Sequence, residues 1–549
     1  MKEVATTPNE PLWWQRGIIY QIYPRSFQDS NGDGVGDLRG IIQRLEYLAE
    51  SLGVDALWLS PFYPSPMTDF GYDISNYVDV DPLFGTLATF DELVREAHAR
   101  NLKVIIDFVP NHSSDQHPWF LESRSSRDNP KRDWYTWTDA KPDGSAPNNW
   151  LSMFGGPAWT WDEATGQFYL HSYLKEEPDL NWRNPAVMEA MLDVMRFWLD
   201  RGVDGFRIDA VLHIMKDPAL RDNPSNPGER IVLGNPPLPE YDSQLHLHDQ
   251  AHPDIHGIFR EMRLVLDGYS QERPRMCIGE LDVFEWPTWA SYYGAELDEL
   301  HMPFNFGLLR VPWTAQAVRG VVDALEVALP PEAWPNFVLG NHDVSRIASR
   351  VGDAQARIAM MLLLTLRGTP TLYYGDEIGM IDVPIAPDQV LDPLQQWAPK
   401  LGRDPLRTPM QWDGGPNAQF CLAGATPWLP IAEDYRRINV ATEREDPRSM
   451  LVLTQALVAA RRASPALLGG AYRSMDHVPP ACLVYVRETM DERRVIALNF
   501  SNSDQTVALP ELGHGQITVS TVLDRREPAD LAKLHLRPNE GCVVTMAPV

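Results

Sequence analysis

The sequence is poor in cysteine, has fewer basic than acidic residues, and lacks a long hydrophobic run. Its 549 residues include four cysteines, none spaced as Cys-x-x-Cys, which argues against a disulfide framework and favours a reducing compartment, with one bridge left open. The longest apolar stretch, Ile358–Leu366, is too short to cross a bilayer, and Met1–Pro11 lacks the apolar core of a signal peptide. We therefore expect a cytoplasmic protein.

The charge balance narrows the possible partners. The 48 Lys and Arg residues against 75 Asp and Glu residues leave a net charge of −27. Such an acidic surface repels phosphate backbones and anionic lipids, so we expect neither nucleic acid nor a membrane surface as a partner. Neutral molecules remain possible as ligands. The hydrophobic content of 44% is that of an ordinary globular protein, and the length predicts two or three domains.

Eight short apolar runs alternate with amphipathic helical stretches along most of the chain. Strands that are buried on both faces lose the in-and-out alternation and form continuous hydrophobic runs. Alternating strands and helices predict a parallel sheet, and eight repeats predict a closed (β/α)8 TIM barrel with its active site at the C-terminal ends of the strands. The predicted strands are Ile18–Tyr23, Ala56–Leu59, Val104–Val109, Gly205–Ile208, Met276–Ile278, His301–Phe306, Phe337–Leu339 and Thr371–Tyr374. The main predicted helices are Leu38–Leu52, Thr89–Arg100, Pro185–Arg201 and Ala354–Leu366.

Three long irregular stretches interrupt this alternation. Residues 111–182 follow the third strand, residues 217–253 the fourth, and residues 381–432 the eighth. Loops of this length inside a domain are usually functional or form a subdomain. We expect all three above the same rim, with 111–182 forming an inserted subdomain over the barrel mouth.

The remaining regions complete the predicted domain organisation. Residues 1–110 and 183–468 form the barrel. In residues 469–549, short strands follow one another without helices, which predicts an antiparallel C-terminal β domain, interpreted as a β-sandwich.

Acidic and histidine side chains follow four of the predicted strands. They lie in the segments Asp107–His112, Gly205–Asp209, Ile278–Glu280 and Gly340–Asp343. A buried carboxylate is costly unless it is paired or used. A single one is more often a helix cap or a structural ion pair than a catalytic group. Four at the same end of one barrel indicate one shared site.

Two of these acids suit opposite chemical roles. Arg207 and Asp209 are two residues apart on a strand, so their side chains project to the same face, where the guanidinium would keep Asp209 ionised and able to act as a nucleophile. A rigidifying ion pair is the alternative. Glu280 follows an apolar strand, and apolar surroundings could keep it protonated as an acid. One ionised and one protonated carboxyl group are what a glycosidase needs.

These four segments, in this order, resemble the signature regions of the α-amylase family of glycoside hydrolases. The segments Tyr20–Phe27 (YQIYPRSF), Gly71–Ile74 (GYDI) and Arg407–Asp413 (RTPMQWD) are similar to those of its bacterial α-glucosidase branch. The resemblance extends from about Leu12 to the C-terminus. It implies a retaining mechanism with the following catalytic residues: Asp209 as nucleophile, Glu280 as general acid/base and Asp343 as stabiliser of the oxocarbenium-like transition state.

The resemblance also implies how the sugar is bound. It implies contacts at the cleavage subsite from His112, Arg207 and His342, with Tyr72 stacked under the sugar ring. Asp69 and Arg403 would bind the non-reducing end, which closes the site into a pocket and favours removal of single glucose units from chain ends. Arg407, in the same segment, is the alternative to Arg403, and a surface salt bridge is the other interpretation of either arginine.

The loop Asp29–Asp37 alternates oxygen-bearing side chains with glycines. Its first part matches an EF-hand calcium loop, but position twelve is Gly40 rather than a glutamate, and the loop follows a strand, which argues against a calcium sensor. The resemblance implies a structural Ca²⁺ or Mg²⁺ here, with these ligands: Asp29, Asn31, Asp33, Asp37 and the carbonyl of Val35. An Asx-rich turn without metal is the alternative, and no redox cofactor is expected.

Two positions depart from the family pattern. Glu177 stands where many relatives have glutamine, so a contact at the rim of the site would carry a charge. Ala210 follows the expected nucleophile, where valine tends to accompany α-1,6 cleavage in the family and threonine α-1,4 cleavage, so alanine indicates neither. Trp150, Trp159 and Trp161 could stack sugars, although packing inside the inserted segment is the more common role of such residues.

Together these features predict a retaining exo-α-glucosidase. It would act on terminal non-reducing bonds of short α-glucosides such as maltose, with a slight preference for α-1,4 bonds, and would also transfer glucose to sugar or alcohol acceptors, as a monomer or homodimer. A glucosyltransferase, or an isomerase of trehalose or sucrose, is the alternative with the same fold, because access of water to the intermediate decides the outcome. A non-catalytic binding or transporter-associated subunit would need a membrane anchor or a broken set of carboxylates, and neither is apparent.

Overall fold

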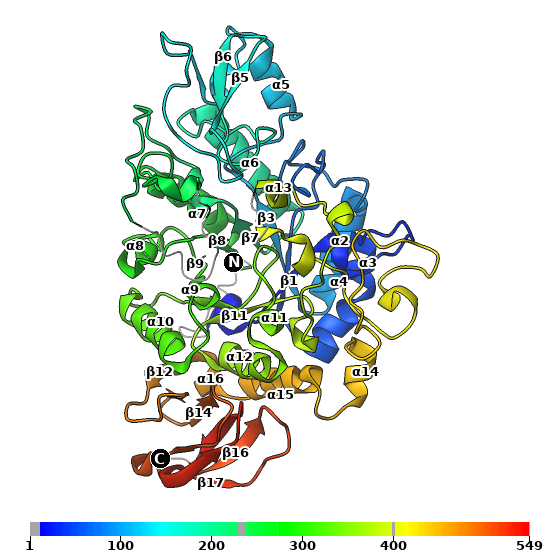
Figure 1. Cartoon of the computed structure of the whole chain (residues 1–549), viewed down its shortest axis with the longest axis vertical. Helices are drawn as coiled ribbons and strands as arrows, with labels where there is room; N and C mark the ends of the chain where they lie inside the picture. Colours follow the sequence, from blue (N-terminus) through cyan, green and yellow to red (C-terminus); the bar gives the residue numbers. More distant parts are fainter. Residues whose placement is uncertain (1–10, 229–237, 239, 272, 398–400, 548–549) are drawn as a thin grey trace, which may run out of the picture.

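An eight-stranded parallel sheet, nearly closed into a barrel, forms the centre of the molecule (Figure 1). The computed structural model describes residues 11–228, 238, 240–271, 273–397 and 401–547, so the predictions for Met1–Glu10 lie outside the described residues. The strands are neighbours in the order β10-β11-β1-β2-β3-β7-β8-β9, which confirms the predicted TIM barrel. Their bounds are β1 Ile19–Ile22, β2 Ala56–Leu59, β3 Lys103–Phe108, β7 Gly205–Ile208, β8 Met276–Gly279, β9 Met302–Pro303, β10 Asn336–Val338 and β11 Thr369–Tyr373.

Burial on both faces explains why these strands are continuous hydrophobic runs. Every residue of β1, β2, β7 and β11 is buried. Side chains of alternate residues point into the barrel and towards the surrounding helices, and apolar side chains predominate in both environments. The prediction was least accurate for the sixth strand, where β9 pairs over two residues only.

Helices surround the barrel. The longer ones are α4 Leu87–Ala99, α6 Pro185–Asp200, α7 Ile255–Tyr269, α10 Ala315–Ala328, α12 Asp353–Thr365 and α15 Met450–Arg462. Side chains cap several of them: Thr86 accepts a hydrogen bond at the start of α4, and Asn184 at the start of α6. The single helix expected over residues 38–52 is instead α3, Leu38–Gln43, followed by a π-helical turn, Tyr47–Leu52, that ends at Gly53 with φ of 81°.

The segment after β3 forms a small antiparallel sheet at one end of the molecule (Figure 1). Its strands are β4 Trp137–Thr138, β5 Trp159–Asp162 and β6 Gln167–Leu170, preceded by helix α5 Pro118–Ser125. Trp150 and Trp159 are buried together in a cluster of their own, so they pack the segment rather than present a surface to sugars. Trp161 is 39% exposed.

The C-terminal strands form a six-stranded antiparallel sheet at the opposite end (Figure 1). Their bounds are β12 Ala471–Ser474, β13 Cys482–Glu488, β14 Arg493–Asn499, β16 His514–Ser520, β17 Pro528–Asp530 and β19 Gly541–Met546, and β15 Gln505–Val507 pairs with β18 Leu534–Leu536. One face carries side chains such as Tyr485 and Leu498 into the same apolar core as the barrel helices. The other face, with Val484 and Ala497, belongs to a separate cluster.

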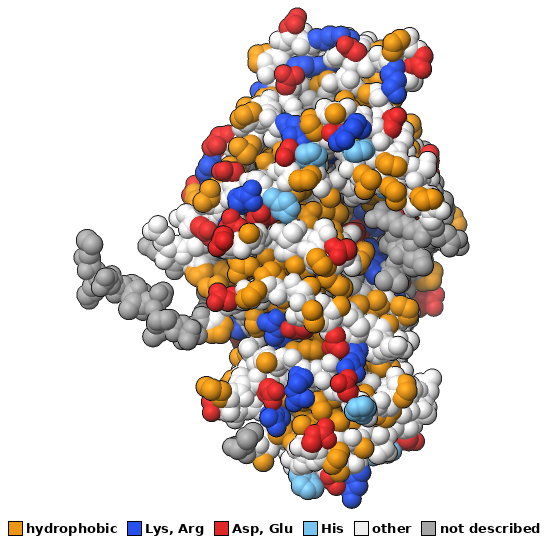
Figure 2. Space-filling model, turned by 90° about the vertical axis from the view of Figure 1, so that its left-hand side faces the viewer, with side chains coloured by type: hydrophobic (Ala, Val, Ile, Leu, Met, Phe, Trp, Pro, Cys, Tyr) orange, Lys and Arg blue, Asp and Glu red, His pale blue; other side chains and the backbone are white. Residues whose placement is uncertain are grey.

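Three further observations concern compartment and surface. All four cysteines are buried and free, so no disulfide forms in this structure. None of the helices within the described ranges is both long and apolar enough to cross a membrane. Acidic and basic side chains are interspersed over the described part of the face in Figure 2, where no continuous basic surface is visible.

Candidate active site

A pocket opens at the C-terminal ends of the barrel strands. Its wall combines residues that follow the strands with residues from all three irregular stretches. The strand ends contribute Asp209, Glu280, Asn341, His342 and Asp343. The long stretches contribute Met153, Phe154, Tyr173, Tyr241, Gln250, Leu394 and Arg403. The three stretches therefore reach one cavity, as the sequence predicted.

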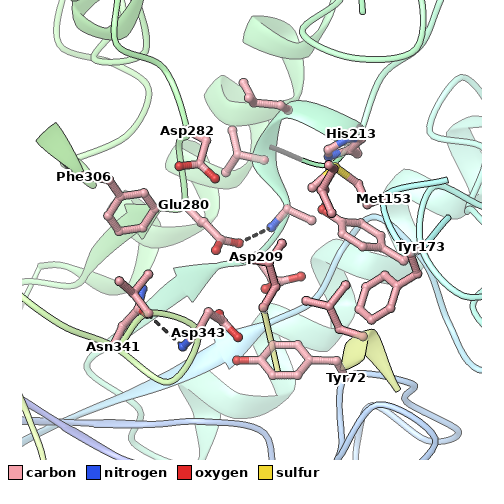
Figure 3. Close-up of a pocket in the computed structure, with 18 of the residues that line it drawn as sticks. Tyr72, Met153, Tyr173, Asp209, His213, Glu280, Asp282, Phe306, Asn341 and Asp343 are labelled. Carbon is pink, nitrogen blue, oxygen red and sulfur yellow. Dashed lines mark hydrogen bonds between the residues drawn. The ribbon is translucent and has the colours of Figure 1, made fainter. Parts of the chain in front are cut away.

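Backbone pairing places Asp209 and Glu280 side by side. The hydrogen-bond ladder continues one residue beyond each strand, since the Asp209 amide donates to Phe108 O at 2.9 Å and the Glu280 amide donates to Ile208 O at 2.9 Å. Both side chains point into the pocket together with Asp343 (Figure 3). Their side chains are 11%, 23% and 31% exposed for Asp209, Glu280 and Asp343 respectively, so a ligand can reach all three.

Arg207 lies beneath the two acids rather than on the pocket wall. Its side chain is 1% exposed, and Nη1 forms a short hydrogen bond to Asp209 Oδ1, while Nη2 lies 2.9 Å from Glu280 Oε1. Nη1 also lies 3.2 Å from Asp107 Oδ1, and Asp107 is fully buried. One guanidinium thus holds two carboxyl groups next to each other. Arg207, for which the family resemblance implied a sugar contact, therefore lies behind the two acids.

The two acids differ in ionisation near pH 7. Burial raises the pKa of Asp209 to about 6, with Arg207 opposing the rise and Asp107 adding to it. Asp209 therefore stays mostly ionised near pH 7, as expected beside Arg207, although its pKa lies above the usual value of an aspartate. Burial raises the pKa of Glu280 to about 8, with Arg207 opposing and the charge of Asp209 adding. One ionised and one protonated carboxyl group result at neutral pH.

Asp343 is held ionised by its neighbours. Its Oδ1 lies 2.8 Å from Arg407 Nη2 and 3.4 Å from Arg403 Nη1, and its Oδ2 lies 3.1 Å from His342 Nε2. Although burial opposes ionisation, His342 and the two guanidinium groups hold the pKa of Asp343 below its usual value. The Asp343 amide donates to Asn341 Oδ1 at 2.9 Å, which fixes the turn (Figure 3).

His342 is held between two hydrogen-bonding side chains. Its Nδ1 lies 2.7 Å from Gln21 Nε2, and its Nε2 lies 2.7 Å from the Tyr72 hydroxyl. Tyr72 stacks on the imidazole with ring centroids 5.5 Å apart and donates from its hydroxyl to Asp107 Oδ2 at 2.9 Å. Burial lowers the pKa of His342 to about 3, so the ring is neutral near pH 7. Gln21, inside the barrel, carries no local sequence signal for this role.

Arg403 and Arg407 occupy different places. Arg403 lines the pocket and pairs with Asp69 at 2.6 Å and with Asp392 at 2.7 Å. Arg407 is fully buried, and its Nε donates to the carbonyl of His342 at 2.8 Å. The pair Asp69–Arg403 therefore lies on the wall, whereas Arg407 supports the turn that carries Asp343. Asp392 was not predicted, because only the folded chain brings residue 392 against Arg403.

The structure corrects the prediction for Glu177. The side chain is fully buried rather than at the rim. Burial, together with the charges of Asp69, Asp73 and Asp209, raises the pKa of Glu177 well above its usual value. Its Oε1 lies 3.5 Å from Nε2 of His112, and burial lowers the pKa of His112, which lines the pocket, to about 4.

Ala210 has an unusual backbone conformation. Its φ and ψ are 49° and 36°, in the left-handed region, and its amide donates to Glu280 Oε2 at 3.0 Å (Figure 3). The turn after Asp209 thus orients Glu280 through the backbone. A β-branched residue adopts this conformation only at a cost. Other wall residues without a sequence prediction are Phe154, Tyr173, Asp282, Phe306 and Arg310.

The predicted metal loop forms a network of turns within itself. Asp29 Oδ1 accepts from the amides of Asn31 and Gly32 at 2.9 and 2.6 Å, and Asp29 Oδ2 accepts from the amide of Gly34 at 2.9 Å. Asp33 accepts from the Val35 amide, and Asp37 accepts from Ser30 and from the Gly40 amide. No group of three or more His, Cys, Asp or Glu side chains in the described ranges, which include this loop, is arranged to hold a metal ion. The predicted ligand set also includes the Asn31 side chain and the Val35 carbonyl, and the metal stays a prediction.

Comparison with known proteins identifies the family. Residues 21–470 match the alpha-amylase family, described as "Alpha amylase, catalytic domain". The chain belongs to the alpha-amylase family. This family membership covers the barrel, the inserted segment and the residues of the pocket.

Three similar proteins differ in the reactions that their names state. The chain is 44% identical to a probable alpha-glucosidase of Rhizobium meliloti (strain 1021), over 95% of this chain and 97% of that protein. It is similar to the crystal structure of the alpha-glucosyl transfer enzyme XgtA, with a TM-score of 0.92, 42% identity, and coverage of 98% of this chain and 100% of that one. It also resembles the trehalulose synthase MutB from Pseudomonas mesoacidophila MX-45, with a TM-score of 0.87, 34% identity, and coverage of 98% and 100%. This alpha-amylase family member is thus a glycoside hydrolase whose relatives include alpha-glucosidases.

Proposed function

We propose that this alpha-amylase family member is a retaining exo-α-glucosidase that hydrolyses terminal α-glucosidic bonds of short α-glucosides such as maltose. The observation that carries the proposal is the arrangement around Arg207, which holds Asp209 and Glu280 side by side in one pocket. Retention requires two carboxyl groups close enough for one to attack the sugar while the other protonates the leaving oxygen. Two acids bound by one guanidinium suit that requirement.

The pKa values suit the two roles. Asp209, with a pKa of about 6, is mostly ionised near pH 7 and would attack the anomeric carbon, forming a glucosyl-enzyme. Glu280, with a pKa of about 8, is mostly protonated and would donate its proton to the departing oxygen. Once deprotonated, Glu280 would accept a proton from water, whose oxygen attacks the anomeric carbon and releases Asp209. Asp343, kept ionised by its cationic neighbours, would stabilise the positive charge that develops on the ring.

The wall around Asp69 supports removal of single glucose units. Asp69 and Arg403 form a buried ion pair on the wall, and both present hydrogen-bonding groups suited to terminal hydroxyls. Tyr72 lies beside them on the same wall, with an aromatic face for the sugar ring. A wall that binds the terminal unit leaves room for only one sugar on the non-reducing side of the scissile bond. The enzyme would therefore remove single glucose units from chain ends.

Transfer to an acceptor is the second candidate outcome. The similarity to a glucosyl transfer enzyme favours it, and so does the wall beside Glu280, where Asp282 and Phe306 lie (Figure 3). A sugar or alcohol hydroxyl bound at this wall would compete with water for the glucosyl-enzyme. We propose that α-1,4 bonds are slightly preferred over α-1,6 bonds as donors. Isomerisation of sucrose or trehalose is the variant in which the departing sugar itself is recaptured.

Incubation with maltose, followed by NMR during the first turnovers, tests this proposal. With maltose we expect glucose and a smaller amount of trisaccharide. With 4-nitrophenyl α-glucoside, whose leaving group is not a sugar, we expect the released glucose to appear first as the α-anomer. Asp209→Asn should lose essentially all turnover, and the matched control Asp491→Asn, which removes an exposed acid far along the chain, should not. First appearance of the β-anomer from the nitrophenyl glucoside, or unchanged activity of Asp209→Asn in a folded protein, would reject the retaining assignment. A new disaccharide as the main product would favour the isomerase instead.

A further inference from the structure

Glu177 is a fully buried carboxyl group that the proposed reaction does not use. Its Oε2 accepts a hydrogen bond from the Leu174 amide at 3.0 Å, and its Oε1 has no hydrogen-bond partner. Within the described residues, the single basic side chain within 4.0 Å of this carboxyl is His112, at 3.5 Å. A buried carboxyl oxygen without a partner is unusual and requires an explanation.

The imidazole of His112 faces Glu177 with the nitrogen that carries its proton. Asn111 fixes this tautomer: its Oδ1 accepts from Lys216 at 2.8 Å, and its Nδ2 donates to Asp179 at 3.0 Å and lies 3.2 Å from His112 Nδ1. Because an amide nitrogen can only donate, Nδ1 accepts, and the neutral ring carries its hydrogen on Nε2. This Nε2 is buried and lies opposite the free oxygen of Glu177, and the His112 ring also interacts with the backbone of Tyr72.

The charges around Glu177 oppose its ionisation. Asp69, Asp73 and Asp209 act on it as negative charges, and Lys216, the cation that acts on His112, is paired with Asp179 at 2.5 Å. Asp69 and Asp209 line the pocket, so a charge on Glu177 would be felt by groups that meet the sugar. These negative charges favour the neutral state of the carboxyl.

We infer that Glu177 is a positioning residue for His112, that its carboxyl is neutral in the binding-competent protein, and that its ionisation weakens glucose binding. The inference rests on the proposed function, which places a glucose unit against His112. An ionised carboxyl would pair strongly with the Nε2–H and turn the ring towards Glu177. It would also add a negative charge beside Asp209 and favour protonation of the nucleophile.

Calorimetric titration with glucose at increasing pH, up to the limit at which the protein stays folded, tests the inference. The variants are Glu177→Gln, which keeps the size and an acceptor oxygen but cannot ionise, and Glu176→Gln, a matched control at the adjacent, half-exposed acid that pairs with Lys175. We expect the glucose Kd of the wild type to rise over this range by about two- to tenfold more than that of Glu177→Gln, the factor corresponding to one neutral hydrogen bond. Glu176→Gln should follow the wild type.

Three results would overturn the inference. Identical pH dependence in the wild type and Glu177→Gln would show that the carboxyl does not act on the pocket through its charge. An equal loss of affinity at every pH would indicate a purely structural role. Glucose that binds to no variant at any pH would reject both the inference and the proposed function, whereas the first two results would leave the proposed function standing. If Glu177→Gln fails to fold, Glu177→Met, equally unable to ionise, replaces it.

Discussion

At the scale of single residues, the proposed mechanism depends on two carboxyl groups with different pKa values. Asp209 and Glu280 share one guanidinium, and burial raises the pKa of both, to about 6 and about 8. The pKa of Glu280 is the higher of the two because the charge of Asp209 raises it further, whereas Asp209 forms the shortest hydrogen bond to Arg207.

These values predict a bell-shaped pH dependence of kcat/KM. Activity should rise as Asp209 loses its proton around pH 6, since only the carboxylate attacks, and fall as Glu280 loses its proton around pH 8, since only the acid protonates the leaving oxygen. Initial rates with maltose from pH 4 to pH 10 provide the measurement. Replacing Glu280 with Gln should abolish the alkaline limb together with most activity on maltose. A profile that is flat across pH 6–8 with a maximum elsewhere would contradict the assignment.

The acids could be predicted at this scale, and several of their partners could not. Each of the three acids, Asp209, Glu280 and Asp343, follows a strand. The C-terminal ends of parallel strands lie at the same end of a barrel, so the local sequence was enough to predict that these acids converge. The contact of Gln21 with His342 spans 321 residues, and that of Asp392 with Arg403 depends on the course of an irregular stretch. Glu177 was misplaced at the rim because its neighbouring residues in sequence do not reveal its complete burial.

At the scale of elements, continuous apolar runs located the strands well. β2 and β7 have the expected bounds, because every residue of both strands is buried. The bounds of α3 could not be predicted, because residues 38–52 have the pattern of one amphipathic helix, and the change to a π-helical turn depends on packing. The short β9 was overestimated because apolar residues after it serve the pocket wall and core instead of the sheet.

The stability of the loop Asp29–Asp37 depends on the hydrogen bonds that Asp29 accepts. Asp29 is 4% exposed and accepts from three backbone amides, so Asp29→Ala leaves these donors without a partner. We expect a loss of about 2–4 kcal/mol in the free energy of unfolding, measured by urea denaturation. If the loop also binds the proposed Ca²⁺ or Mg²⁺, chelator should lower the Tm of the wild type and leave that of Asp29→Ala unchanged.

Each result for this loop has a distinct meaning. A chelator effect of equal size in both proteins would place any metal elsewhere. No effect in either would favour the Asx-rich turn without metal. A wild-type stability in Asp29→Ala would contradict the role assigned to the three amide hydrogen bonds.

At the scale of the whole molecule, segments that are distant in the sequence pack together in two regions. The apolar core of the barrel helices continues into one face of the C-terminal sheet, through residues such as Tyr485, whose hydroxyl lies 2.5 Å from the Thr365 hydroxyl of α12. This contact explains why α12 is buried almost all round, a pattern unusual for an outer barrel helix. At the other end, the three irregular stretches converge on the pocket. The sequence predicted this convergence from loop length, but not which side chains reach the wall.

The most direct measurement of the central claim is the trapping of a glucosyl-enzyme. Glu280→Gln keeps Asp209 and the pocket but lacks the acid/base, so α-glucosyl fluoride, whose leaving group needs no protonation, should form the intermediate faster than water removes it. Mass spectrometry of peptides should then find one glucosyl group attached to Asp209. A glucosyl group on a different residue, or turnover of the fluoride to β-glucose without any adduct, would contradict the account.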